Sequence, residues 1–381
     1  MFNVVLISIC AIMRYFFKYI VLMTLLFYAI PASAKITVAL IMPMAEDYRE
    51  QGAELTRGVE RALEEINHNG GILNNKISLL KIDDQCNSSI AVSTAQMLSI
   101  QKNKVSLVIG PYCANAFEQI ASIYADARIF QIIPTTVDYS QAKIIKKGLV
   151  KMLGYTNQEA KDFFAFYNTH FAGDRVAVVH NVNNGESVSE AKAITDEFQK
   201  HGKSAIIQSY NYQETDKDYI ALSEKIIESG AKVAFLLGSS ANIRKMAYAL
   251  RREQPDFVIF TNRYKAGDKY FDTLEDYADG TYFMELKGTI DDPEFAETLV
   301  KLRLSGFEAE GLALYGYSAL KLWQSLVLKA KSFDYNKLSS VANNKAIHTE
   351  LGYKMFHNGA PKTNESYAIY RYENGDFVKV Y

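Results

Sequence analysis

Two cysteines, Cys86 and Cys113, are the residues whose type and spacing point most directly to chemistry. The third cysteine, Cys10, lies in an apolar segment at the start of the chain. No CxxC pair occurs, and the six histidines are scattered without an HExxH spacing, so the sequence indicates no metal site. Two cysteines in an exported chain favour one disulfide, and two buried free thiols are the alternative.

Motifs for catalysis are also missing from the sequence. It has no G-x-S-x-G, no Walker loop and no G-x-G-x-x-G after its first predicted strand. Asp83 and Asp84 are adjacent, so their side chains point to opposite sides at the end of an extended strand. They suit a turn better than a pair of catalytic carboxylates. His180 ends a predicted strand without a recognisable nucleophile. We therefore expect a binding protein that is not an enzyme and needs no cofactor.

The charge balance argues against nucleic acid as a partner. The 381 residues include 42 Lys and Arg and 43 Asp and Glu, which gives a net charge of -1. There is no basic excess to neutralise phosphates. Hydrophobic residues make up 49% of the chain, so it can bury a core and is long enough for two lobes.

The first 34 residues have the pattern of a signal peptide. Positive charge at Arg14 and Lys18 precedes an apolar run over 19–30, and a small-residue cleavage site ends at Ala34. A membrane anchor is the alternative, but the apolar run is short for a membrane span. We expect export of the chain, with cleavage after Ala34.

Strand and helix patterns alternate in two series along the rest of the chain. Short apolar runs, typical of strands buried on both faces, are followed by segments that carry apolar residues on one helical face. The predicted strands are 36–42, 77–82, 106–110 and 129–133 in the first series, and 175–180, 204–210, 232–238 and 257–261 in the second. Repeated strand–helix units predict an α/β fold with parallel sheets.

The two series predict two lobes that face each other across a cleft. We expect a first lobe of residues 35–153 plus 286–350 and a second of residues 154–285 plus 351–381, because the mixed tail indicates a return to both. Ligands of open parallel sheets bind beyond the carboxyl ends of the strands. A small-molecule site is therefore expected where the two carboxyl edges meet.

Seven stretches of the chain carry a family resemblance through their order and spacing. They are ALIMPM (39–44), QGAELTRGVERALEEINHNGGI (51–72), KIDDQC (81–86), LVIGPYC (107–113), RVAVVH (175–180), ALYGYSALKLW (313–323) and TELGYKMFHNG (349–359). Together they resemble the leucine-binding-protein family, the type I periplasmic binding proteins of branched-chain amino acid type ABC importers. The resemblance implies two Rossmann-like lobes on a multi-segment hinge, a periplasmic location and a membrane permease as partner. It also implies a disulfide between Cys86 and Cys113.

The resemblance carries over only part of the family's ligand site. Amino-acid-binding members use a Ser after the disulfide cysteine and a nearby Thr for the ligand carboxylate. This chain has Ala114 and Asn115 at the first position, and Thr135 and Thr136 at the second, although the threonines could instead cap the next turn. Arg263 aligns with the acidic residue that takes the ligand ammonium. A misalignment by one or two residues, or an Arg263 turned to solvent, is the alternative.

Further candidates are assigned to the cleft by topology. Tyr48 lies in the first strand–helix loop and could stack on a ligand, and Tyr155 lies where the chain first crosses between lobes. Asn184 and Glu186 follow strand 175–180, and Ser239 and Ser240 follow strand 232–238. Glu186 could take a ligand ammonium or simply begin a helix.

The expected function is solute capture for an ABC importer, with a small amino acid or an organic acid as the ligand. Ala114 and Arg263, where the family has a hydroxyl and an acid, favour a carboxylate without an α-ammonium. A ligand-sensing protein of the same fold that signals to a partner is the alternative function.

Overall fold

The computed structural model describes most of the chain after the predicted signal peptide, which itself lies outside the described residues. The described ranges are 36–44, 48–100, 105–113, 116–137, 143–153, 155–213, 219–266, 269–286, 293–307, 311–349, 351–357, 359–361 and 367–381. Among the helices in these ranges, none has the length and apolar character that crossing a membrane requires.

The first large sheet has five parallel strands in the order β2-β1-β3-β4-β5. The strands are β1 (Ile36–Met42), β2 (Ile77–Asp83), β3 (Val105–Ile109), β4 (Phe130–Ile133) and β5 (Leu149–Lys151). The first four correspond to predicted strands. The fifth has only three residues, too few for a hydrophobic period to be visible in the sequence.

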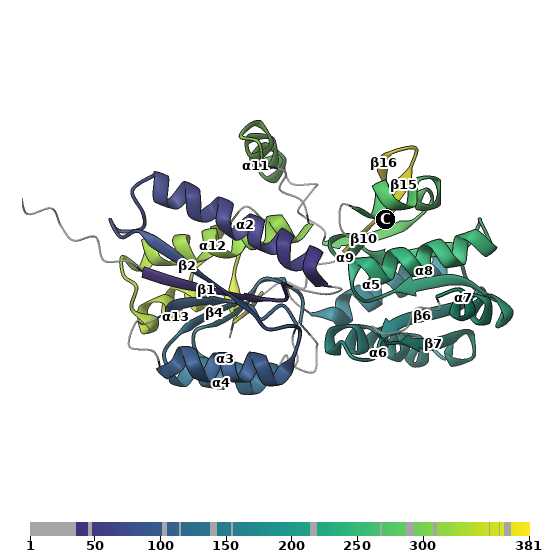
Figure 1. The fold of residues 1–381 in the computed structure, drawn as a ribbon, viewed down its shortest axis with the longest axis horizontal. Helices are drawn as coiled ribbons and strands as arrows, with labels where there is room; N and C mark the ends of the chain where they lie inside the picture. The colour runs from purple at the N-terminus through teal and green to yellow at the C-terminus, as the bar shows by residue number, and fades with distance from the viewer. Residues whose placement is uncertain are drawn as a thin grey trace, which may run out of the picture. The chain divides into compact units, whose positions relative to one another are not determined.

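Helices cover both faces of this sheet (Figure 1). Val38 and Leu40 of β1 belong to the core under α2 (Arg49–His68) and α12 (Gly311–Ala330). Ala39 and Ile41 belong to the core under α3 (Ser88–Ile100) and α4 (Phe117–Asp126). Successive strand residues point to opposite faces, so one apolar run supplies both cores.

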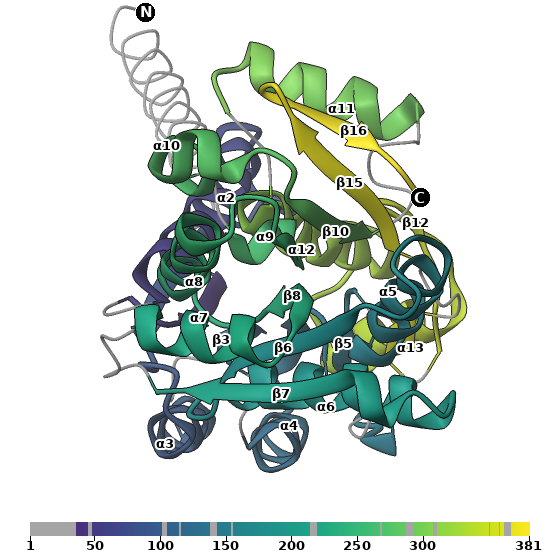
Figure 2. The ribbon, with the colours of Figure 1, turned by 90° about the vertical axis from the view of Figure 1, so that its right-hand side faces the viewer.

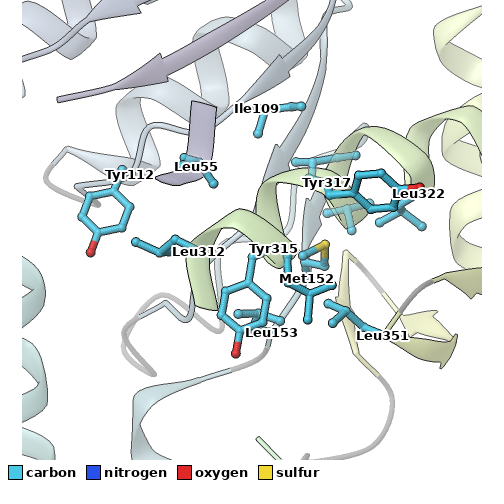
Figure 3. Packing of buried hydrophobic residues seen from close by; sticks show 14 of the residues in the cluster. Leu55, Ile109, Tyr112, Met152, Leu153, Leu312, Tyr315, Tyr317, Leu322 and Leu351 are labelled. Atoms are coloured by element: carbon cyan, nitrogen blue, oxygen red, sulfur yellow. The ribbon is translucent and has the colours of Figure 1, made fainter. Parts of the chain in front are cut away.

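Two glycines let α2 and α12 pack closely. A Cβ atom at Gly58 would lie 1.8 Å from the carbonyl oxygen of Ala313, and one at Gly316 would lie 2.3 Å from that of Leu55. Figure 3 shows the neighbouring side chains, including Leu55 of α2 and Leu312 of α12. Any larger residue would push the helices apart, so this contact anchors a late segment of the chain to the first sheet.

The second large sheet has seven strands in the order β16-β15-β10-β9-β8-β6-β7. Strands β6 to β10 run parallel, whereas β15 and β16 are added antiparallel. The bounds are β6 (Arg175–Asn181), β7 (Ile207–Tyr212), β8 (Ala231–Leu236), β9 (Val258–Asn262), β10 (Tyr282–Leu286), β15 (Tyr367–Glu373) and β16 (Asp376–Lys379). The predicted strand 204–210 begins late: its first three residues form a 3₁₀ turn because pairing with β6 starts only at Ile207.

Helices also cover both faces of the second sheet (Figure 2). The core with α5 (Thr156–His170) and α6 (Gly185–Lys200) includes Val176 and Val178 of β6. The core with α7 (Tyr219–Glu228) and α8 (Ser240–Glu253) includes Ala177 and Val179. The same alternation along a buried strand therefore organises both sheets.

Shorter elements complete the described chain. They are α9 (Arg263–Ala266), α10 (Lys269–Leu274), α11 (Pro293–Leu304), α13 (Tyr335–Asn344), β11 (Ile347–Thr349), β12 (Gly352–Lys354), β13 (Phe356–His357) and β14 (Ala360–Pro361), with 3₁₀ turns at Ser204–Ile206 and Glu275–Ala278. Strand β11 pairs with β12, and β13 with β14, in two small antiparallel ribbons.

The two large sheets share no strand, and both lie in the compact unit of residues 36–381. We call the five-stranded sheet with α2, α3, α4 and α12 the first lobe, and the seven-stranded sheet with α5 to α8 the second lobe. The chain passes between them after β5, after β10 and before β15. The predicted two-lobed α/β architecture is confirmed, while the lobe boundaries given above stay a prediction.

Candidate ligand-binding site

Cys86 and Cys113 lie beyond the carboxyl ends of β2 and β3, the two neighbours of β1. The structure joins them in a disulfide, with their Cα atoms 5.2 Å apart, a separation within the usual range for disulfides. The bridge ties together two loops at the carboxyl edge of the first sheet, where the sequence predicts the ligand site.

Two tyrosines line the same edge. Tyr48 precedes α2 and Tyr112 follows β3, and both side chains are buried. Their ring centroids lie 6.4 Å apart. Tyr48 was predicted from its loop position, whereas Tyr112 was missed because it lies inside the stretch that ends at Cys113.

Thr135 and Thr136 follow β4 and are both buried. Val137, the next residue, pairs with Tyr155 in an isolated parallel bridge. Tyr155 stands directly before α5, and the ammonium of Lys151 lies 5.2 Å from the centroid of its ring. The structure thus brings the predicted threonines to the segment where the chain first crosses into the second lobe.

Three predicted site residues cannot be placed in this way. Ala114 and Asn115 lie outside the described residues. Arg263 is the first residue of α9, directly beyond β9, but its side chain is outside the described set. Its proposed role in binding a carboxylate therefore stays a prediction.

Asn184 and Ser239 cap helices of the second lobe. The Asn184 side chain accepts a hydrogen bond from the Ser187 amide (2.7 Å) at the start of α6. The Ser239 hydroxyl accepts one from the Asn242 amide (3.2 Å) at the start of α8. The Asn184 side-chain nitrogen also lies 4.0 Å from the Cys86 sulfur, so this cap touches the first lobe.

Glu186 belongs to a buried group of charges that we call the carboxylate cluster: Glu159, Glu186 and Glu190 around Lys265. The Lys265 ammonium lies 3.4 Å from a Glu186 oxygen and contacts Glu190. Glu159 accepts a hydrogen bond from the side-chain nitrogen of Asn262 at 2.6 Å. The cluster joins the first turns of α5 and α6 to α9.

The burial of these groups shifts their protonation. Burial raises the pKa of Glu190 to about 7, although Lys265 opposes the shift. Burial and then the charge of Glu190 raise the pKa of Glu159 well above its usual range. Burial alone would lower the pKa of Lys265, but the three carboxylates outweigh it and the net shift is upward. These shifts favour the protonated form of Glu159 and the charged form of Lys265.

The carboxylate cluster faces the first lobe. Burial, followed by the charges of Glu186, Glu190 and Glu54, raises the pKa of Tyr112 well above its usual range. Coulombic effects of this kind fall off with distance. A phenol at the carboxyl edge of the first sheet therefore lies close to the charges at the carboxyl edge of the second, as expected for a site between lobes.

A second place where the lobes touch joins α2 to α8. A Glu50 oxygen accepts hydrogen bonds from Arg244 (2.9 Å) and from the Ser240 hydroxyl (3.1 Å). The Ser240 hydroxyl also lies 3.3 Å from the side-chain oxygen of Gln51. Ser240 was predicted to face the cleft, whereas Glu50, Gln51 and Arg244 were not among the predicted candidates.

Spacing gives a partial signal for the missed residues. Glu186 and Glu190 are four residues apart and therefore lie on the same face of α6. Two like charges on a buried helix face repel each other and are costly without a nearby cation. Ser240 and Arg244 have the same spacing on α8. The partner of each pair comes from a distant segment, which the spacing does not reveal.

Other features of the described residues do not add to this site. A cavity of about 560 Å³ is lined by residues of β1, β2, α2 and the segment 306–307, and none of the predicted site residues is among them. In the described part of the chain, no group of three or more His, Cys, Asp and Glu side chains is suited to a metal ion.

Comparison with known proteins gives a family match over nearly the whole chain. A family model described as periplasmic binding protein matches residues 35–376. An amino acid binding protein of Pseudomonas aeruginosa is 24% identical over 353 residues, which cover 90% of this chain and 91% of the relative. A Leu/Ile/Val-binding protein of Rhizobium johnstonii is 24% identical over 355 residues, covering 91% and 94%.

Solved structures share the fold. A leucine binding protein from Thermotoga maritima has a TM-score of 0.78 at 18% identity and covers 91% of this chain and 98% of its own. A solute binding protein of an ABC transporter from R. palustris, in complex with benzoate, has a TM-score of 0.78 at 16% identity and covers 91% and 96%. The chain belongs to the periplasmic binding protein family, and its predicted resemblance to the leucine-binding proteins is confirmed.

Proposed function

We propose that this chain is the solute-binding component of an ABC importer of the branched-chain amino acid type. It captures a small amino acid or a related carboxylate between its two lobes. The observation that carries the proposal is that polar groups beyond the strands of both sheets come close together: the side-chain nitrogen of Asn184 in the second lobe lies 4.0 Å from the sulfur of Cys86 in the first. The relatives support this reading, since one is named for amino acids and one solved neighbour holds benzoate.

The first lobe supplies the groups for the ligand carboxylate in this proposal. Thr135 and Thr136 offer hydroxyl donors beside the crossing segment, and the amides at the start of α4 favour an anion through the helix dipole. Tyr48 and Tyr112 provide aromatic surface for the rest of the ligand. The hydroxyls replace the family's Ser in part, since Ala114 has none.

The chain's three crossings between lobes make hinge closure the expected response to the ligand. A ligand that contacts both lobes binds the closed form more tightly than the open one, and this difference shifts the population. A membrane permease that recognises the closed form then receives the solute.

We also propose that the chain acts in the periplasm after cleavage behind Ala34, with the Cys86–Cys113 bridge formed. N-terminal sequencing and intact-mass measurement of the exported protein test both points. The expected mature chain begins at Lys35 and is two mass units lighter than its reduced form. A retained N-terminus or two free thiols would contradict them.

Mass spectrometry of compounds that co-purify with the exported protein, followed by calorimetric titration, tests the function. The titration compares amino acids with carboxylates of the same skeleton, such as leucine with 4-methylpentanoate, which lacks the ammonium. Replacing both threonines (Thr135→Val and Thr136→Val) should weaken binding of the ligand by about tenfold or more, since each lost hydrogen bond to a charged group is worth about 1.5–3 kcal/mol.

Thr169→Val is the matched control, because this threonine is exposed on α5 and bonds only to the Ala165 carbonyl. It should bind as the wild type does. The proposal fails if no amino acid or carboxylate binds the folded protein, or if the paired threonine variant binds as tightly as the control.

A further inference from the structure

The contact between α2 and α8 joins the lobes through four side chains, Glu50, Gln51, Ser240 and Arg244, which we call the α2–α8 contact. Glu50 and Gln51 lie in the first turn of α2, and Ser240 and Arg244 lie four residues apart on one face of α8. The three contacts among these side chains all run from one lobe to the other, at 2.9 to 3.3 Å. A hinge motion of a few ångströms would break all of them.

Burial and helix dipoles strengthen this contact. The side chains of Glu50 and Arg244 are only 15% and 14% exposed, so solvent screens the pair less than it screens a surface pair. The Glu50 carboxylate lies in the first turn of α2 and contacts the first residue of α8, so the positive ends of two helices favour its charge. Hydrogen bonds of this charged kind are stronger than neutral ones.

The contact is built from the protein's own groups. Glu50, Gln51 and Arg244 are not among the predicted ligand contacts, and the hydroxyl of Ser240, which was predicted to face the cleft, is bonded to Glu50 of the other lobe. A contact present in the closed arrangement and absent from the open one adds its full free energy to the balance between them.

We propose that the α2–α8 contact is an interlobe latch that populates the closed arrangement before any solute binds and so raises the affinity for the solute. The inference rests on the hinge closure of the proposed function. It assigns Glu50 and Arg244 as positioning residues, which act on the solute only through the lobe arrangement.

The distance between the lobes of the ligand-free, full-length mature protein tests the latch. Spin labels at Glu118→Cys on α4 and Glu224→Cys on α7, both exposed helix positions, report that distance. Glu50→Gln and Arg244→Gln should each lower the ratio of closed to open protein by about tenfold, the effect of losing one charged hydrogen bond. The double variant should lower it little further, because each residue acts through the other.

Glu64→Gln is the matched control, an exposed carboxylate on the same helix. It should match the wild type in its ratio of closed to open protein. Thermal unfolding verifies that each variant is folded, and Arg244→Gln tests the same bond from the other lobe if Glu50→Gln fails to fold. Distances in both single variants equal to those of the control would overturn the latch, as would additive effects in the double variant.

Adding leucine, 4-methylpentanoate or benzoate to the labelled wild type separates the two proposals. The same solutes are added to the labelled Glu50→Gln variant, in which the latch does not hold the solute-free protein closed. If the variants shift the distance and no solute closes Glu50→Gln, the latch stands and solute capture fails. If solutes close the wild type while the variants match the control, solute capture stands and the latch fails.

Discussion

The carboxyl edges of the two sheets bury different polar groups. The first lobe buries the hydroxyls of Thr135 and Thr136, the ammonium of Lys151 and the carboxyl of Asp84, and none of the ion pairs found among the described residues involves Asp84. The second lobe buries Glu186 and Glu190 around Lys265. A buried charge is costly unless it is paired, and Lys265 pairs with these two carboxylates within the lobe. We therefore expect the first edge to favour an anionic ligand, whereas part of the charge at the second edge is balanced within the lobe.

Removal of Lys265, the cation of the carboxylate cluster, should have the largest effect on the free energy of unfolding. Lys265→Met leaves Glu186 and Glu190 buried without their partner, and breaking a buried pair typically costs about 3–5 kcal/mol of unfolding free energy. Urea unfolding at pH 8 measures the loss. Lys301→Met, which removes an exposed pair with Glu297, should leave the free energy of unfolding nearly unchanged. Equal stability of the two variants would mean that the second edge does not depend on its ion pair.

The disulfide should be the main covalent support of the first edge. Cys86→Ser with Cys113→Ser removes a bridge between residues 27 apart and should lower the unfolding free energy by about 3 kcal/mol. Reductant should weaken the wild type to the same extent and leave the double variant unchanged. A wild type that is indifferent to reductant would show that the bridge contributes nothing.

Asp84 should make the first lobe less stable as the pH rises. Burial raises the pKa of Asp84 to about 6, against the hydrogen bond from the Cys86 amide. The folded state therefore holds this proton at a pH where the unfolded chain, with a pKa near 3.8, has lost it. Stability falls between about pH 4 and pH 6, by about 2–3 kcal/mol if the whole shift is realised, and the loss persists above pH 6.

The variant Asp84→Asn, which keeps an oxygen for the Cys86 amide, should flatten the stability profile in that interval. Asp256→Asn, at an exposed position, serves as the control and should leave the profile unchanged. Stability measured by urea unfolding at half-unit steps of pH decides the outcome. If the stability of Asp84→Asn depends on pH in the same way as that of the control, Asp84 is not the group whose ionisation lowers the stability.

The helix cap at Ser239 should give the smallest effect. Ser239→Ala removes the acceptor for the Asn242 amide and should cost about 1 kcal/mol of unfolding free energy. Since its hydroxyl is used by α8, affinity for the solute should stay unchanged. A clear loss of affinity in calorimetry would instead make Ser239 a ligand residue, as the sequence suggests.

Hydrophobic pattern was sufficient to predict the two lobes, because strands such as β1 and β6 each hold a run of consecutive buried apolar residues. The same pattern put Tyr48 at a carboxyl edge, since topology alone decides which strand ends meet, whereas the two threonines were assigned through the family resemblance. It missed the three-residue β5, which has no period to detect.

The charged part of the site could not be predicted in the same way. Lys265 is defined by partners on α5 and α6 that are far from it in the sequence, and its burial follows from tertiary packing. Glu50 and Arg244 lie 194 residues apart and meet only because the lobes do. Residue spacing along one helix identifies the residues that share a face of that helix, but it does not identify their partners from distant segments.

Small-angle scattering of the mature protein, with and without its co-purified ligand, tests most directly whether the two lobes close over a small solute. We predict a smaller radius of gyration with ligand, and a larger decrease when the identified compound is given to Glu50→Gln, in which the latch does not close the ligand-free protein. Identical scattering curves across amino acids and carboxylates that are shown to bind would contradict closure.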